Sequence, residues 1–128
     1  MNRRELVRNS VMILAAMALP AAAHAQEPYE GKSFASAIAS GPVVVHVFAG
    51  WCPVCQKQKP ILATLARDHA LAGVRFVTVD FDKDSHFLRT YRVGNQSVIL
   101  LFKSGQEVVR LIGVTDPENI RARLLGAL

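Results

Sequence analysis

The sequence of 128 residues predicts a single α/β domain with a mixed sheet and helices on both faces. Short runs rich in β-branched residues alternate with helical patterns, which is typical of strands joined by crossover helices. Two late runs flank Ser104-Gly105, a turn signal that makes at least this pair of strands antiparallel. The length leaves little room for a second domain.

The first 25 residues predict a secretory signal peptide, cleaved after Ala25, so that the folded domain spans residues 26–128. Three arginines in the first eight residues precede the apolar run Val11–Leu19, and small residues stand at Ala23 and Ala25. The alternative is a membrane anchor, but a spanning helix needs roughly 20 apolar residues, more than this run supplies. The pair Arg3-Arg4 only loosely resembles a twin-arginine signal, so the export route stays open.

Composition argues against a nucleic-acid partner. The whole chain has a formal charge of +5, and removal of residues 1–25 takes away three arginines and one glutamate, leaving +3. The remaining basic residues are scattered, and no ladder of aromatic residues suits base stacking. An exported chain with two cysteines points instead to the bacterial periplasm, where disulfides persist and thiol chemistry is managed.

The first half of the domain predicts a helix, a strand and a second helix. Lys32–Ser40 has helical character and stops at Gly41-Pro42, a strong break. Val43–Phe48 is a nearly continuous apolar run, as expected of a strand covered on both faces. After a short loop, a helix is predicted to begin near Pro53 and to run towards His69, because its apolar residues are spaced for one face.

The second half predicts three more strands and two helices. Val74–Val79 is another buried strand, and Ser85–Tyr91 is a short helix with Ser85 or Asp84 as its cap. Val98–Lys103 and Glu107–Ile112 form the hairpin. The last helix has Thr115 or Asp116 as its cap and Pro117 in its first turn, and ends near Leu125.

The chemistry is predicted at Cys52-Pro53-Val54-Cys55, between a buried strand and a helix start. Cys52 would be the N-cap, where free backbone N–H groups and the helix dipole favour an accessible thiolate. Pro53 suits the first helical position because it needs no donor there. Cys55 lies one turn further in, shielded, and suits attack on a mixed disulfide formed by Cys52.

Two other readings of the cysteine pair are less favoured. A structural disulfide would close a loop of about four residues, worth only about 2 kcal/mol in the chain-entropy model. A zinc site needs two further ligands, and no histidine has ligand spacing to the cysteines. We therefore expect a redox-active pair with no cofactor and no bound metal.

The domain resembles the thioredoxin family over nearly its whole length. The matching residues are the strand Val43–Phe48 leading into Ala49–Cys55, Pro60 in the following helix, Phe81-Asp82, Leu100–Gly105 and Gly113. The resemblance implies a central sheet of four or five strands. It also implies Cys52 as the attacking cysteine, Cys55 as the resolving cysteine, and Trp51 as a residue that shields the site and shapes substrate docking.

Three departures from the family pattern stand close to the site. Pro53-Val54 replaces Gly-Pro between the cysteines, so the redox potential of thioredoxin itself does not carry over. His46 stands where the family has a buried acid beneath the resolving cysteine; it is either a proton acceptor for Cys55 or a core histidine hydrogen-bonded to a neighbour. Ser97 stands at the family's cis-proline; we expect a trans bond, because non-proline cis bonds cost about 2.5–4 kcal/mol.

The resemblance implies a thiol–disulfide oxidoreductase that serves cell redox homeostasis, and the predicted signal peptide places it in the periplasm. Its expected partners are protein thiols and disulfides and a membrane-embedded electron donor, and a monomer is expected. The reductase direction is favoured, because only about 30 residues separate Cys55 from Ser85 and leave no room for the inserted helical domain of the larger periplasmic oxidases. The alternative is a thioredoxin-like metal chaperone for copper or haem assembly, or a redox-linked binding module, which Ser97 and His46 keep open.

Overall fold

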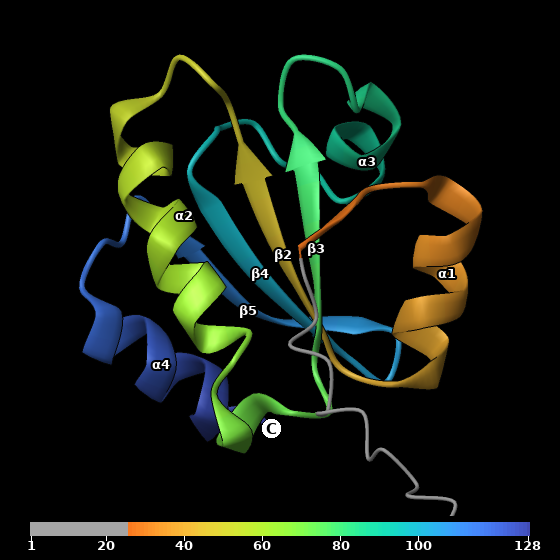
Figure 1. The fold of residues 1–128 in the computed structure, drawn as a ribbon. Coiled ribbons are helices and arrows are strands. Elements are labelled where there is room, and N and C mark those ends of the chain that lie inside the picture. The colour runs from red at the N-terminus through yellow and green to blue at the C-terminus, as the bar shows by residue number, and fades with distance from the viewer. Residues whose placement is uncertain (1–25) are drawn as a thin grey trace, which may run out of the picture.

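Residues 26–128 form one five-stranded sheet in the computed structural model (Figure 1). The order across the sheet is β1-β3-β2-β4-β5, with β1, β3 and β2 parallel to one another and β4 antiparallel to both β2 and β5. The predicted mixed sheet is therefore confirmed. The strands are β1 (Glu27–Pro28), β2 (Val43–Phe48), β3 (Arg75–Asp80), β4 (Val98–Lys103) and β5 (Gln106–Ile112).

Within residues 26–128, four α-helices cover the two faces of the sheet. Figure 1 shows α1 and α3 on one side of the strands and α2 and α4 on the other. The two central clusters of buried side chains follow the same division. The helices are α1 (Gly31–Ser40), α2 (Pro53–Leu65), α3 (Ser85–Thr90) and α4 (Pro117–Gly126), with a 3₁₀ turn, η1 (His69–Leu71), between α2 and β3.

The central strand β2 contributes side chains to both faces. Successive side chains of a strand point to opposite faces, and Val43, Val45 and Val47 accordingly pack on the side of α1 and α3. Val44 packs with the side chains of α2 and α4. His46, two residues further along, lies on the same face as Val44 and faces α2. The only histidine of β2 is thus carried into the core beneath the helix that follows the cysteine pair.

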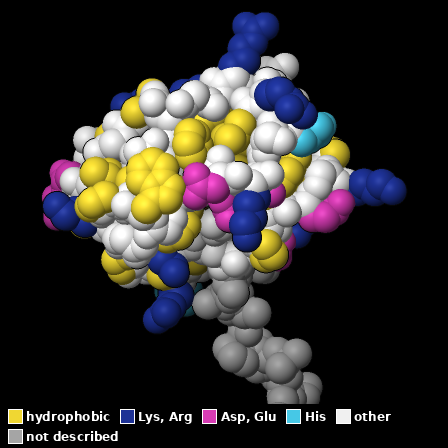
Figure 2. Space-filling view, turned by 90° about the horizontal axis from the view of Figure 1, so that it is seen from above, with side chains coloured by type: hydrophobic (Ala, Val, Ile, Leu, Met, Phe, Trp, Pro, Cys, Tyr) yellow, Lys and Arg dark blue, Asp and Glu magenta, His cyan; other side chains and the backbone are white. Residues whose placement is uncertain are grey.

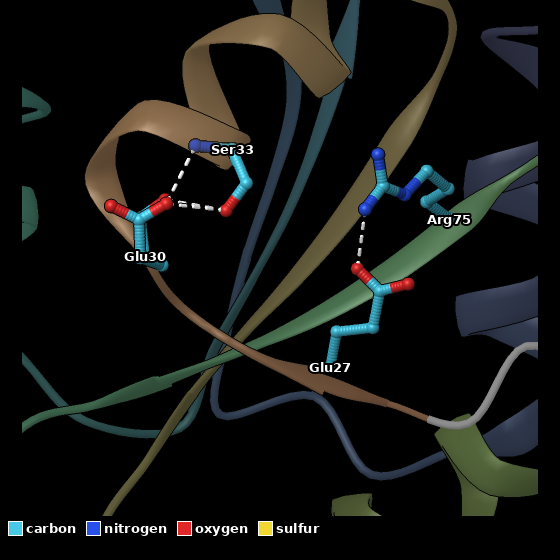
Figure 3. Close-up of polar contacts among 4 residues, drawn as sticks. All are labelled: Glu27, Glu30, Ser33 and Arg75. Carbon is cyan, nitrogen blue, oxygen red and sulfur yellow. Dashed lines mark hydrogen bonds and ion pairs between the residues drawn. The ribbon is translucent and has the colours of Figure 1, made fainter.

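Polar contacts at the start of the described chain fix its entry into the sheet. The Glu30 carboxylate caps α1 by accepting hydrogen bonds from the Ser33 backbone N–H at 2.8 Å and from the Ser33 hydroxyl at 2.6 Å (Figure 3). Figure 3 also shows Arg75, on β3, donating to Glu27, on β1. This ion pair joins the neighbouring parallel strands β1 and β3. Both side chains are about 40% exposed, so the contribution of the pair to stability is small.

The structure corrects the end of one predicted helix and the bounds of one predicted strand, and it adds a strand that was not predicted. The helix predicted to run towards His69 ends at Leu65, because the Asp68 side chain accepts the Ala70 backbone N–H and starts η1 instead. The strand predicted over Val74–Val79 lies one residue later, at Arg75–Asp80. The two-residue strand β1 was not predicted, because so short an element carries no sequence period.

The predicted signal peptide, residues 1–25, and its cleavage after Ala25 lie outside the described residues. Within residues 26–128, no helix has the length and apolar character needed to cross a bilayer.

Candidate active site

The cysteine pair lies at the end of the sheet where β2 leads into α2. Cys52 is the N-cap of α2 with extended backbone angles (φ −93°, ψ 115°), and Pro53 is its first helical residue. The Cys52 sulfur accepts a hydrogen bond from the Cys55 backbone N–H at 3.2 Å. The predicted capping position of Cys52 is therefore confirmed, and the free N–H groups of the helix start point at its sulfur.

The surroundings of the two sulfurs push their pKa values in opposite directions. Burial alone would raise the pKa of Cys52, but hydrogen bonds from the Cys55 thiol, the backbone N–H groups of Cys55 and Val54, and the Gln96 side chain outweigh it, so the pKa lies below its ordinary value. Burial raises the pKa of Cys55, and its role as donor to Cys52 raises it further. The geometry favours one thiolate, on Cys52, beside one protonated thiol.

The prediction that Cys52 is accessible is wrong. Only 3% of Cys52 is exposed, and Cys55 is fully buried. Cys52 and Cys55 form a small apolar cluster with Ala49, and Phe48, Val54 and Phe81 pack against it. The sequence could not show this cover, because Phe81 comes from the loop after β3. Cys55 is shielded, as predicted.

Trp51 is the most exposed large apolar side chain beside the cysteines, with 60% of its surface open. Its indole N–H donates to the Asp82 carboxylate at 3.0 and 3.2 Å, and its ring meets Phe81 edge to face at 6.5 Å. Figure 2 views the molecule from this end and shows hydrophobic side chains gathered on the surface, with acidic and basic groups among them. Asp82, which sequence reasoning did not single out as a site residue, fixes the orientation of the tryptophan.

His46 is hydrogen-bonded to Gln58, a residue that sequence reasoning did not single out. Its Nε2 lies 2.9 Å from Gln58 Oε1, while Gln58 Nε2 lies 3.0 Å from the carbonyl oxygens of both Ser97 and Val114. Carbonyl oxygens only accept hydrogen bonds, so the Gln58 amide nitrogen must face them and its oxygen must face His46. His46 therefore carries its proton on Nε2 and presents a bare Nδ1, which has no partner among the described residues.

The pKa of His46 is lowered to about 4, mainly by burial and to a smaller extent by the nearby Lys59 charge, against an opposing effect of the Gln58 hydrogen bond. The imidazole is therefore neutral at physiological pH. The prediction of a core histidine bonded to a neighbour is confirmed. The other prediction, a proton acceptor for Cys55, stays a prediction.

Ser97 is buried and trans, since no cis peptide bond occurs among the described residues. Its φ of 57° places it in the left-handed region, which costs a residue with a side chain on the order of 1 kcal/mol. Its N–H donates to Val47 O at 2.9 Å, and its carbonyl accepts from Gly113 N at 2.9 Å. The same Val47 oxygen lies 3.9 Å from the Cys55 sulfur. Ser97 and the resolving cysteine thus lie beside the same carbonyl oxygen, that of Val47.

In the part of the chain that the structure describes, no third side chain joins the two cysteines to form a metal site. Within residues 26–128, no three histidine, cysteine, aspartate or glutamate side chains lie close enough together to hold an ion. His69 and His86 are exposed and stand on other elements. His46 has a free Nδ1, but among these residues it belongs to no such group of three side chains.

Comparison with known proteins gives one consistent family. A family model described as Thioredoxin matches residues 26–125, from β1 into the last turn of α4. The thioredoxin of Chlamydia pneumoniae is 40% identical over 87 residues, which cover 68% of this chain and 83% of that protein. The thioredoxin of Chlamydia trachomatis serovar D is 36% identical over 89 residues, covering 70% and 85%. Among solved structures, Trxlp from Edwardsiella tarda EIB202 matches with a TM-score of 0.75 at 40% identity, covering 78% of this chain and 98% of that one.

Proposed function

The chain belongs to the thioredoxin family and is a thiol–disulfide oxidoreductase, and from this premise we propose that it reduces protein disulfides in the bacterial periplasm through Cys52 and Cys55. The observation that carries the proposal is the Cys52 sulfur at the N-cap of α2, held by the Cys55 N–H at 3.2 Å with the protonated Cys55 thiol beside it.

The reaction proceeds by two exchanges at sulfur. The Cys52 thiolate attacks one sulfur of a substrate disulfide, a mixed disulfide forms, and the other substrate sulfur leaves as a thiolate that takes up a proton. Cys55 then loses its proton and attacks the Cys52 sulfur, which releases the second substrate thiolate and leaves a Cys52–Cys55 disulfide. Two electrons pass from the protein to the substrate, and a second exchange with an electron donor restores the dithiol.

Substrate docks, in this proposal, against Trp51 and the backbone of Gln96. Trp51 supplies an exposed apolar ring held by Asp82. The Gln96 backbone N–H and C=O make no backbone hydrogen bond within residues 26–128, so both remain open to an extended peptide. Because only 3% of Cys52 is exposed, docking also has to move part of the apolar cover around that sulfur.

Other features of the chain support the proposed direction, compartment and partners. Between Cys55 and α3 the chain contains only the remainder of α2, η1 and β3, with no inserted helical domain, which supports reduction over oxidation. The predicted signal peptide supports a periplasmic location. A reductase in this oxidising compartment requires a membrane-embedded electron donor, because the cytosolic systems that keep thiols reduced are absent there. We propose a monomer that receives electrons from this donor and passes them to protein disulfides. The lowered pKa of Cys52 works against a very reducing potential, since it stabilises the dithiol form.

Reduction of insulin by dithiothreitol in the presence of the protein tests the proposal. Wild-type protein is expected to turn over, and Cys52→Ser is expected to lose the activity. No turnover by wild type, together with stoichiometric metal on the purified protein, would support the metal-chaperone alternative instead. For the direction, equilibration with glutathione is expected to give a midpoint nearer to about −270 mV than to about −120 mV, the oxidase end of the range.

A further inference from the structure

Gln58 is a fully buried amide in the middle of α2 whose partners come from three other segments. Its oxygen faces His46 on β2, and its nitrogen reaches the Ser97 carbonyl before β4 and the Val114 carbonyl after β5. Both of its N–H groups and its oxygen are therefore used. An amide placed in an apolar core is strongly unfavourable unless its polar atoms are hydrogen-bonded in this way.

The segment that Gln58 holds is the one that borders both sulfurs. Ser97 is in the left-handed conformation, its N–H bonds to Val47 O, and that oxygen also lies 3.9 Å from the Cys55 sulfur. On its other side, Gln96 contributes a hydrogen bond that stabilises the Cys52 thiolate. A shift of the Ser97 peptide would therefore move the edge formed by Gln96 relative to Cys52.

Ser97 stands where the thioredoxin family has a proline. A proline ring fixes its own φ, whereas a serine does not. Ser97 is instead held by hydrogen bonds, and its carbonyl receives two of them, from Gly113 N and from Gln58 Nε2. Within residues 26–128, Gln58 supplies the only side-chain hydrogen bond to that carbonyl.

We propose that Gln58 is a positioning residue for protein substrates: by tethering the Ser97 carbonyl, it keeps the Gln96 edge in place beside Cys52. The inference rests on the proposed disulfide exchange, and it assigns to Gln58 an effect on substrate peptides that pair with this edge. Its effect on the intrinsic reactivity of the sulfurs is small, because the hydrogen bonds that lower the Cys52 pKa most come from Cys55 and Val54 on α2, and Gln96 contributes the least of them. A small aromatic disulfide needs no backbone pairing and should be indifferent to the tether.

The test compares Gln58→Met, which keeps the length of the side chain and removes the amide, with Gln106→Met, the same change at an exposed position of β5. For Gln58→Met, KM for insulin should rise about fivefold, the size expected for one net hydrogen bond. The rate with the small aromatic disulfide DTNB should stay within about twofold of wild type, because that reaction lacks the lost interaction. Gln106→Met should match wild type in both assays.

Amide hydrogen exchange gives a readout that does not depend on turnover. The Gly113 N–H shares the Ser97 carbonyl with Gln58, so its exchange should accelerate in Gln58→Met and not in Gln106→Met. If Gln58→Met does not fold, NMR of the wild type replaces it, and the two Gln58 side-chain N–H protons should exchange slowly.

An unchanged KM for insulin, an equal loss of activity with insulin and DTNB, or fast exchange of the Gln58 side-chain protons would each overturn the proposal. No turnover of either substrate by wild type would overturn the proposed function, and with it the substrate role of Gln58. The Gly113 exchange rates would then still report whether the tether itself exists.

Discussion

Replacement of His46 by leucine should make the protein less sensitive to acid. The imidazole is buried and neutral, with a pKa of about 4 in the folded protein and about 6.5 in the unfolded chain. Above pH ~6.5 it is neutral in both states and adds nothing to the pH dependence. As the pH falls from ~6.5 to ~4, the unfolded chain binds a proton that the folded protein excludes, so stability falls.

The size of this effect follows from the pKa difference. One pKa unit corresponds to about 1.4 kcal/mol, so the full effect of His46 is about 3 kcal/mol and develops by about pH 4. Between about pH 7 and about pH 4.5, wild type should lose about 2 kcal/mol more of its free energy of unfolding than His46→Leu does. At neutral pH the variant is itself less stable, by about 1–3 kcal/mol, because the Gln58 oxygen loses its donor.

Urea denaturation of the reduced protein at the two pH values measures the difference. Glu30 and Asp68, whose pKa values are lowered by hydrogen bonds from Ser33 and Arg121, also weaken the fold in acid, but they do so equally in both proteins and cancel. His69→Gln removes an exposed imidazole and serves as the control. Equal acid sensitivity of wild type and His46→Leu, or an NMR titration of His46 near pH 6.5, would refute the reasoning.

Three further predictions concern the thiols, the tryptophan and a helix cap. Cys55→Ala removes the thiol that donates to Cys52, so the Cys52 pKa should rise, seen in the ultraviolet absorbance of the thiolate against pH; an unchanged or lower pKa would contradict the assigned hydrogen bond. Asp82→Ala should alter the fluorescence of Trp51, the chain's one tryptophan, while unfolding free energy changes by less than about 1 kcal/mol, and identical spectra would exclude the indole–carboxylate bond. Asp116→Ala removes the N-cap of α4 and should cost about 1 kcal/mol in urea denaturation, with Glu118→Ala as a neighbouring control; no loss would show that the cap contributes nothing.

The strands were the easiest elements to predict from the sequence. Val43–Phe48 and Val98–Lys103 have the predicted bounds, because a dense run of buried apolar residues leaves little freedom in placing a central strand. The end of α2 was harder. Its apolar spacing continues past Leu65, and only the local hydrogen bond of Asp68 to Ala70 N ends the helix earlier.

The cysteine pair was predictable because its chemistry depends on local structure. An N-cap sulfur and a second sulfur one turn later follow from the C-x-x-C spacing and Pro53. The burial of Cys52 was not predictable, since Phe81, which packs against the cluster that contains Cys52, comes from another loop.

Gln58 carried a signal that sequence reasoning did not use. Cys55, Gln58, Leu62 and Leu65 follow one another at helical spacing, so a polar residue occupies the buried face of α2. Its partners could not be predicted, because two of the three are backbone carbonyls brought there by the fold.

Alkylation of the reduced protein tests the central claim most directly. The claim is that Cys52 is the thiolate and that Cys55 is the protonated, resolving thiol. Brief treatment with iodoacetamide near neutral pH, followed by peptide mass spectrometry, reports which sulfur reacts first. The arrangement at the start of α2 predicts modification of Cys52 well before Cys55, in spite of the small exposed area of Cys52. Earlier modification of Cys55, or equal rates at the two sulfurs, would contradict it.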